Sequence, residues 1–72
     1  MSEGAKILIY INGRSRLISA EMNLICLLDT LQMPSDSVTI EHNGELILQK
    51  KFATTFCKNG DTLNLIRVIS GN

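Results

Sequence analysis

The first apolar residues of the chain alternate with other residues in a way that predicts a β-strand over Lys6–Asn12. Three isoleucines repeat there with a period of two, at Ile7, Ile9 and Ile11. The pair Asn12-Gly13 is typical of a tight hairpin, because both positions tolerate a positive φ. We therefore expect Arg14–Ser19 to form a second strand that pairs back on the first.

The apolar period then changes to that of an amphipathic helix. Four leucines fall at i, i+3, i+4 and i+7, at Leu24, Leu27, Leu28 and Leu31. Asn23 precedes them and can cap the helix, and Pro34 predicts a helix end near Gln32 or Met33. Each buried leucine contributes about 1.5–3 kcal/mol, so this helix is expected to supply the core.

Strand patterns return in the second half of the chain. Three further strands are predicted, at Val38–His42, Leu46–Gln49 and Thr62–Val68. Turns are expected at Asn43-Gly44 and Asn59-Gly60-Asp61. Lys50–Lys58 has no clean period, and we expect a turn of 3₁₀ helix there with Phe52 and Phe56 covering one end of the core.

The order of these elements predicts an α+β fold, a mixed sheet of four to five strands with one main helix packed across one face. The first and last strands are expected to be central parallel neighbours, which suits a right-handed crossover through the helix. With 72 residues, we expect a single domain over 1–72 with flexible ends at 1–5 and 69–72.

Composition narrows the possible functions. Hydrophobic residues make up 44 % and no apolar run reaches the roughly 18 residues of a membrane span. Seven basic residues balance seven acidic ones, which disfavours nucleic-acid binding. The start, Met1-Ser2-Glu3-Gly4-Ala5, does not resemble a signal peptide, so a cytoplasmic location is expected. A domain this small has no room for a large enzyme cleft, so we expect no catalytic residues and favour a carrier or an interaction module.

The few chemically versatile side chains are expected to be structural. Cys26 and Cys57 have no second Cys or His at ligand spacing, so no metal site is predicted. Cys26 lies about 150° from the centre of the leucine stripe and should be at least partly exposed, whereas Cys57 should be a small buried hydrophobe. His42 is expected to be a strand-edge residue satisfied by backbone or water, and Lys50-Lys51 a solvated pair.

Five short motifs occur in a suggestive order: Ile11-Asn12-Gly13, Leu27-Leu28, Asn43-Gly44-Glu45, Asn59-Gly60-Asp61 and Ile69-Ser70-Gly71. In order and spacing they resemble the ThiS-like sulfur carrier proteins of thiamine biosynthesis, within the ThiS/MoaD superfamily, over about residues 6 to 71. The resemblance implies a ubiquitin-like β-grasp fold. Two positions depart from the family pattern: Leu48-Gln49 replaces a frequent Pro-Arg pair, and Asn72 stands where the terminal glycine is expected.

The resemblance also implies a carrier role for the tail residues Ser70, Gly71 and Asn72. In this family, an adenylating enzyme of the ubiquitin-activating type (ThiF-like) uses ATP to activate the terminal carboxylate. Sulfur derived from a cysteine desulfurase then gives a thiocarboxylate, which feeds a thiazole synthase (ThiG-like). The carrier itself binds no cofactor and is expected to be a monomer when free.

Asn72 leaves several readings open. A protease removes Asn72 and leaves Gly71 as the terminus, or the carrier reaction tolerates Asn72, or Asn72 is an artificial addition. In the remaining alternative the chain no longer carries sulfur. The alternatives to a thiamine carrier are the small subunit of molybdopterin synthase, with the same fold and tail, and a ubiquitin-like interaction module without sulfur. An RNA-associated β-grasp domain is disfavoured by the zero net charge and the few aromatic residues.

The sheet side away from the helix is the predicted docking surface. If the alternating isoleucines of the first strand face the helix, four apolar residues face the other way, at Leu8, Tyr10, Ile66 and Val68. A one-helix fold leaves that side uncovered, and exposed contiguous apolar surface usually marks a partner site. Arg67 is expected to supply a polar rim. The resemblance points to the same place, since such carriers dock through the sheet next to the tail.

Overall fold

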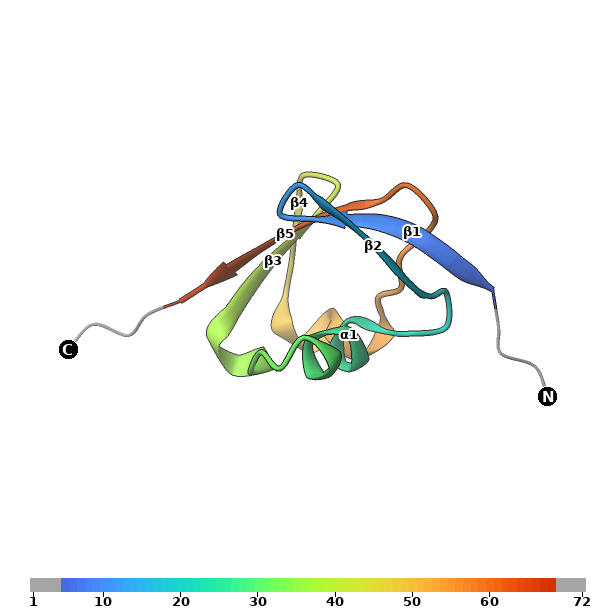
Figure 1. Ribbon diagram of the computed structural model, residues 1–72. Helices are drawn as coiled ribbons and strands as arrows, with labels where there is room; N and C mark the ends of the chain where they lie inside the picture. The colour runs from blue at the N-terminus through green and yellow to red at the C-terminus, as the bar shows by residue number, and fades with distance from the viewer. Residues whose placement is uncertain (1–4, 69–72) are drawn as a thin grey trace.

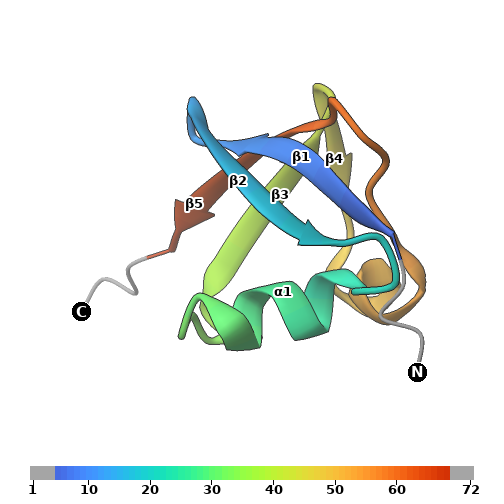
Figure 2. The same cartoon turned by 45° about the vertical axis from the view of Figure 1, so that its right-hand side comes forward.

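A computed structural model describes residues 5–68 as a five-stranded sheet with its helices on one side (Figures 1 and 2). The elements are β1 Lys6–Ile11, β2 Arg14–Ser19, α1 Leu24–Thr30, a 3₁₀ helix η1 Ser35–Ser37, β3 Val38–His42, β4 Glu45–Ile47, a 3₁₀ helix η2 Gln49–Thr54 and β5 Thr62–Arg67. The predicted α+β class and its single main helix are confirmed. Within these residues, no helix is long and apolar enough to cross a bilayer.

The first and last strands lie side by side at the centre of the sheet, as predicted. The strand order is β2-β1-β5-β3-β4. Only β1 and β5 pair in parallel, whereas the other three pairings are antiparallel. Because β1 and β5 run in the same direction, β1 begins at one end of the molecule and β5 ends at the other (Figure 1).

The two hairpin turns have the backbone conformation that their sequences predict. Asn12 and Gly13 have φ of 51° and 85°, and Asn43 and Gly44 have φ of 54° and 86°. Two consecutive positive φ values are those of a type I′ turn, whose twist matches that of the flanking strands. Local sequence therefore accounts for both hairpins.

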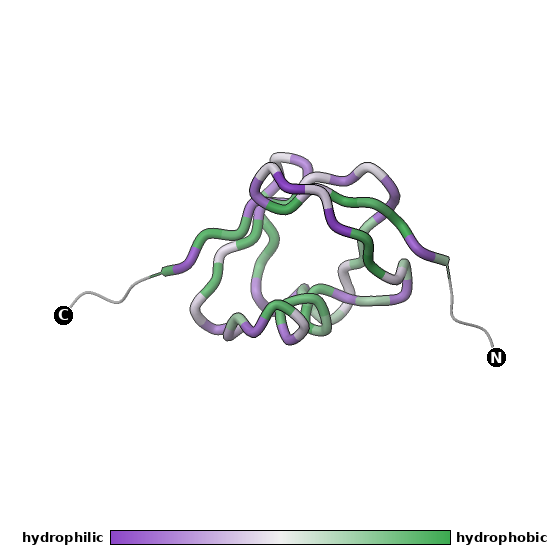
Figure 3. Tube along the Cα trace, in the orientation of Figure 1, coloured by the Kyte–Doolittle hydropathy of each residue, from purple (hydrophilic) through white to green (hydrophobic). Residues whose placement is uncertain are grey.

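The core lies between the sheet and α1, where apolar residues gather along the inner strands (Figure 3). Its fully buried large side chains come from the sheet, from α1 and from η2: Ile9, Leu24, Leu27, Leu28, Ile40, Phe52 and Leu63. Three of the four predicted leucines are thus buried, and Leu31 is half-buried against them. The Asn23 side chain caps α1 by accepting a hydrogen bond from the Cys26 amide at 2.8 Å.

The prediction for Phe56 was wrong. Phe52 is buried, but Phe56 is 49 % exposed. Phe56 forms an isolated antiparallel bridge with Asn23, and the next residue, Cys57, is buried. In extended backbone successive side chains point to opposite sides, so Cys57 takes the inward position and Phe56 faces solvent.

The helix also ends earlier than Pro34 suggested. Gln32 has φ of 60°, its amide donates to the Asp29 carbonyl at 3.0 Å, and the Met33 amide donates to the Leu28 carbonyl at 2.9 Å. These two bonds form a Schellman motif, in which a left-handed residue closes the helix. This position usually holds glycine, so a glutamine there does not indicate a helix end.

Replacing Gln32 with glycine should stabilise the protein. A side chain in the left-handed region costs about 1–2 kcal/mol, and Gln32 is exposed, so little packing is lost. Because glycine also loses more backbone entropy on folding, we expect a net gain of about 0.5–1 kcal/mol in the free energy of unfolding. Urea denaturation of Gln32→Gly measures it; Gln32→Ala should give no comparable gain, and equal stability of both variants would contradict this reading.

Candidate functional site

The side of the sheet away from α1, here called the open face, carries the predicted docking residues. Tyr10, Ile66 and Val68 are 39 %, 51 % and 54 % exposed, and Leu8 is half-buried. Strand alternation places them opposite the buried Ile7, Ile9 and Leu63, as expected. The open face is therefore apolar at the positions the sequence named.

The strand register does not bring these four residues together. Tyr10 is level with Thr62, and the Gly60 amide donates to the Leu8 carbonyl at 2.7 Å. Ile66 lies six residues beyond Gly60, which is about 20 Å along a strand. Leu8 instead pairs across the hairpin with Leu17, which is 66 % exposed. The open face thus has two separate apolar regions, and only Ile66 and Val68 lie near the end of β5.

Two exposed leucines that were not named from the sequence lie on the open face beyond β3. Ile66 of β5 is opposite Thr39 of β3, whereas Leu46 of β4 is opposite Glu41, two residues nearer the β3–β4 turn. Leu48 directly follows β4, and both leucines are exposed. Both leucines line a groove of about 310 Å³ with Glu45, Ile47, Lys51 and Thr55. We call Ile66, Val68, Leu46 and Leu48 the tail-side patch. The alternation of Leu46 and Leu48 with the partly buried Ile47 already indicated a common side, although the strand is Glu45–Ile47 and not the predicted Leu46–Gln49.

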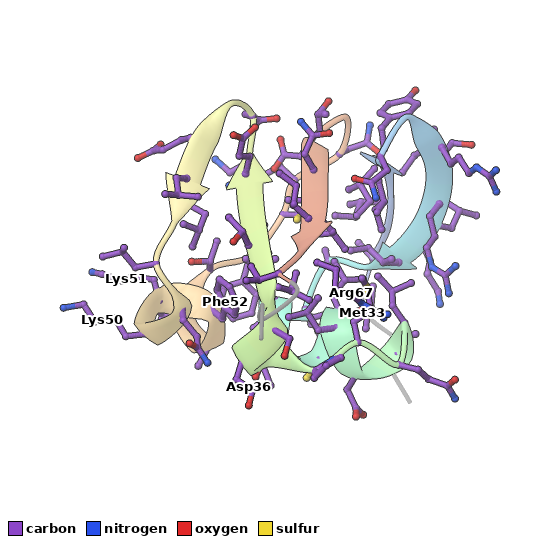
Figure 4. All side chains as sticks on the ribbon, turned by 90° about the vertical axis from the view of Figure 1, so that its left-hand side faces the viewer. Met33, Asp36, Lys50, Lys51, Phe52 and Arg67 are labelled. Atoms are coloured by element: carbon purple, nitrogen blue, oxygen red, sulfur yellow. The ribbon has the colours of Figure 1, made fainter. Side chains whose placement is uncertain are left out.

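Arg67 lies on the other side of the sheet. Its register partner is Val38, a buried core residue, and directly opposed residues of antiparallel strands share a face. Figure 4 shows Arg67 near the end of β5, on the side toward Met33, and Lys50 and Lys51 projecting outward from η2. The exposed Arg67 side chain therefore does not border the open face.

The Asn12 side chain fixes β5 where β1 turns away. Its Oδ1 accepts from the Leu65 amide at 2.8 Å, and its Nδ2 donates to the Leu65 carbonyl at 3.3 Å. The parallel β1–β5 ladder itself ends at Leu63, whose carbonyl accepts from the Asn12 amide at 2.9 Å. Asn12 thus extends the contact between β1 and β5 by two residues, from Leu63 to Leu65, toward Ile66 and Val68.

Substituting Asn12 with glycine should isolate this contribution, because glycine keeps the positive φ and removes the amide. Loss of both bonds leaves the backbone groups of Leu65 without their partner, at a cost of about 1–3 kcal/mol. Urea denaturation measures the loss. Asn12→Asp keeps the acceptor and should lose less; a glycine variant as stable as the parent would contradict the role of the bridge.

The side chains of His42 and Asp61 are hydrogen-bonded to each other at the start of β5, so the prediction that backbone or water satisfies His42 was wrong. The His42 Nε2 lies 2.6 Å from Asp61 Oδ2. Asp61 also accepts from the Lys58 amide at 2.8 Å and from Asn43 Nδ2 at 3.1 Å. Burial alone would raise the pKa of Asp61, but these hydrogen bonds from His42, Lys58 and Asn43 together hold it below its usual value.

The lowered pKa of Asp61 predicts a stability that depends on pH. A carboxyl group with a depressed folded-state pKa stabilises the fold above its unfolded pKa of about 3.9, and the stabilisation disappears as the pH falls through the folded pKa. Asp61→Asn should therefore be less stable than the parent near pH 7, and the difference should narrow below about pH 4. Urea unfolding across this range, with chelator present, measures both curves; a difference independent of pH would contradict the assignment.

The two thiols differ as predicted. Cys26 is exposed and Cys57 is buried. Burial, and then the nearby negative charge of Asp61, raise the pKa of Cys57 to about 11. A thiol with such a pKa is protonated near neutral pH and is a poor nucleophile, so the geometry gives Cys57 no role as an attacking group.

The predicted tail residues Ser70, Gly71 and Asn72 lie outside the described residues, as do most of the predicted flexible ends. Ala5 is the exception: its carbonyl accepts from the Ala20 amide at 2.8 Å. At the other end, the Val68 amide donates to the Ser37 carbonyl at 2.7 Å. The chain is thus held to the sheet up to Val68, beside the tail-side patch.

Comparison with known proteins places this geometry in a family. The model of the ThiS family matches residues 7–71. The crystal structure of the thiamine biosynthesis protein (ThiS) from Geobacter metallireducens superposes with a TM-score of 0.79 at 26 % identity, covering 92 % of this chain and 100 % of that one. An NMR solution structure of a thiamine biosynthesis protein from the same organism gives 0.73 at 30 % identity, covering 92 % and 88 %.

A curated relative joins a similar segment to a longer protein. A protein from Paramagnetospirillum magneticum (strain ATCC 700264 / AMB-1) named thiazole synthase is 33 % identical over 63 residues. The match covers 88 % of this chain and 19 % of that protein, so the chain spans about a fifth of the relative's length. The solved structures, in contrast, match over nearly their full length, and they confirm the β-grasp fold.

Proposed function

This chain belongs to the ThiS family, and we propose on that basis that it is a sulfur carrier protein for the synthesis of the thiazole part of thiamine. The family match over residues 7–71 is the observation that carries the proposal. The chain is a co-substrate in this role rather than an enzyme. A ThiF-like partner adenylates the C-terminal carboxylate with ATP, and sulfur from a cysteine desulfurase displaces the adenylate to leave a thiocarboxylate.

The placement of β5 supports this role. β5 is paired with β3 from Leu63 to Arg67 and runs toward the end of the sheet that carries Ile66 and Val68. A partner that binds the tail-side patch would meet the chain where residues 69–72 follow. Apolar residues at the centre of an interface supply most of its binding energy, so we propose Ile66 and Val68 as the docking residues for the adenylating enzyme.

A ThiG-like thiazole synthase is the proposed recipient of the sulfur. The support is the relative named thiazole synthase, which contains a segment similar to this chain within its own polypeptide. Two activities joined in one chain act on a common intermediate more readily, because the linkage raises their effective concentration. The free thiols of Cys26 and Cys57 suit a reducing compartment, and we place the reaction in the cytoplasm.

Whether sulfur is transferred to this chain depends on the residue at position 72. A glycine lacks a Cβ and adopts conformations closed to other residues, so Gly71-Asn72 is the point at which this chain differs from a Gly-Gly tail. We propose that the carboxylate of Gly71 bears the sulfur after Asn72 is removed. Transfer to an intact Asn72 tail, and no transfer at all, are the alternatives that the experiment separates.

The test is the intact mass of the chain after incubation with a ThiF-like enzyme, ATP, a cysteine desulfurase and cysteine. Replacement of one carboxylate oxygen by sulfur is the expected gain, on the full chain or on the chain lacking Asn72. A chain that ends at Gly71 and an Asn72→Gly variant both have a terminal glycine and serve as positive controls. Gain on the chain ending at Gly71 but not on the parent would support transfer after removal of Asn72. No gain in any of the three would overturn the carrier role, and gain only on Asn72→Gly would assign the parent to a non-carrier class.

Docking through the tail-side patch predicts a matched difference between two aspartate variants. Ile66→Asp places a charge in the proposed interface and should slow the mass gain about tenfold or more, equivalent to about 1.4 kcal/mol. Leu17→Asp places the same charge on a leucine that is even more exposed, at the far end of the open face, and should leave the rate near that of the parent. Equal rates for both variants would refute this docking site.

A further inference from the structure

We propose that His42, Cys57 and Asp61 form a binding site for a zinc ion, a property separate from the carrier role. The three residues come from the end of β3, from the segment after η2 and from the position before β5. Imidazole nitrogen, thiolate sulfur and carboxylate oxygen are the donor types that zinc binds in proteins. Because the three residues are 4 to 19 positions apart in the chain, no ligand-spacing motif predicts this site.

The distances between the three donor atoms are close to those around a bound zinc ion. The donor atoms of the three side chains all lie within 4.8 Å of one another. Around a tetrahedral zinc, bond lengths of about 2.0–2.3 Å put donor atoms about 3.3–3.6 Å apart. The 2.6 Å contact between His42 Nε2 and Asp61 Oδ2 therefore has to widen by less than about 1 Å. Side-chain rotations suffice, because both residues are partly exposed.

The charges and the burial of the site fit zinc better than a hard cation. A thiolate at Cys57 and the carboxylate of Asp61 together balance the two positive charges of the ion, and His42 binds as the neutral ring. Cys57 is buried, whereas the side chains of His42 and Asp61 are 19 % and 14 % exposed. The exposed side leaves room for a water as the fourth ligand. A sulfur donor selects against Mg²⁺ and Ca²⁺, which prefer oxygen.

Neighbouring groups already orient the carboxylate. Asn43 Nδ2 donates to Asp61 Oδ1 at 3.1 Å, and the Lys58 amide donates at 2.8 Å to Oδ2, the oxygen that also contacts His42. Such outer hydrogen bonds hold ligands in position in metal sites. Binding replaces the S–H bond of Cys57 by an S–Zn bond, and the proton leaves to solvent. The ion would join the turn at Asn43 to the start of β5, away from Ile66 and Val68 at the other end of that strand.

The test uses the chain alone, without any partner of the carrier reaction. Co²⁺, a spectroscopic substitute for zinc, should bind one per chain, with a near-ultraviolet thiolate-to-cobalt band and the visible spectrum of a tetrahedral ion. Zn²⁺ should displace it and raise the melting temperature, since a ligand that binds only the folded state stabilises it.

Matched variants assign the ligands. Cys57→Ala should abolish the thiolate band, while Cys26→Ser, the control at the exposed cysteine, should keep it. The amide of His42→Gln can still donate to Asp61, but it is a poor zinc ligand. Loss of a hydrogen-bond partner outside the ligand shell already costs about 10–100-fold in metal affinity, so loss of a ligand should weaken zinc binding about a hundredfold. Circular dichroism of each metal-free variant checks that it folds. If Cys57→Ala does not fold, the zinc affinities of His42→Gln and Asp61→Asn decide whether the site exists. No stoichiometric binding, or binding that Cys26→Ser removes and Cys57→Ala retains, would overturn the site.

Discussion

The parallel pairing of β1 with β5 is the interaction on which the rest of this structure depends. It joins the two ends of the described chain at the centre of the sheet, yet its ladder is short, with Tyr10 and Ile11 as the registered residues of β1. Asparagine side chains lengthen it at both ends: Asn59 Oδ1 accepts from the Leu8 amide at 2.8 Å, and Asn12 bridges Leu65. Asn43 holds the other side of β5 by accepting from the Thr62 amide at 2.8 Å. Each of these asparagines precedes a glycine in a turn, so the turns that reverse the chain also fasten its last strand.

This arrangement explains how a domain with a small core presents a defined end. β1 turns away at Asn12-Gly13, so the last residues of β5 continue with β3 as their only neighbouring strand. The side chains of Ile66 and Val68 stand exposed there, beyond the hairpin and far from Leu8 and Leu17. The stable body thus sets the position of the chain at Val68. The proposed sulfur transfer would take place on the residues that follow. The proposed zinc site acts at the other end of β5, where it would strengthen the body without covering the docking residues.

Most of the fold could be predicted from local patterns. The period of two in the strands, the leucine spacing of α1 and the Asn-Gly pairs each have a direct physical cause, and all of them agree with the structure. The predictions that failed depend on long-range or unusual backbone features. Phe56 faces solvent because Cys57 takes the inward position, and α1 ends at a left-handed Gln32, which sequence preference does not favour.

The site was harder to predict than the fold, because alternation tells which side of a sheet a residue faces but not its level along the neighbouring strand. Leu8 and Ile66 share the open face, but the register separates them, and Arg67 falls on the opposite side with Val38. The pairing of His42 with Asp61 depends on two turns meeting in space, which the sequence separation hides. The family resemblance named the pathway, while the register determined which surface lies beside the tail.

The most direct test of this account is an NMR titration of the ¹⁵N-labelled chain with an unlabelled ThiF-like adenylating enzyme. The account predicts that the amide signals of Ile66 and Val68, and of their neighbours on β3 and β4, shift or broaden first, while those of Leu8 and Leu17 stay unchanged. Changes centred on Leu8 and Leu17, or on α1, would show that the partner binds elsewhere and would contradict the claim that the end of β5 is the docking surface.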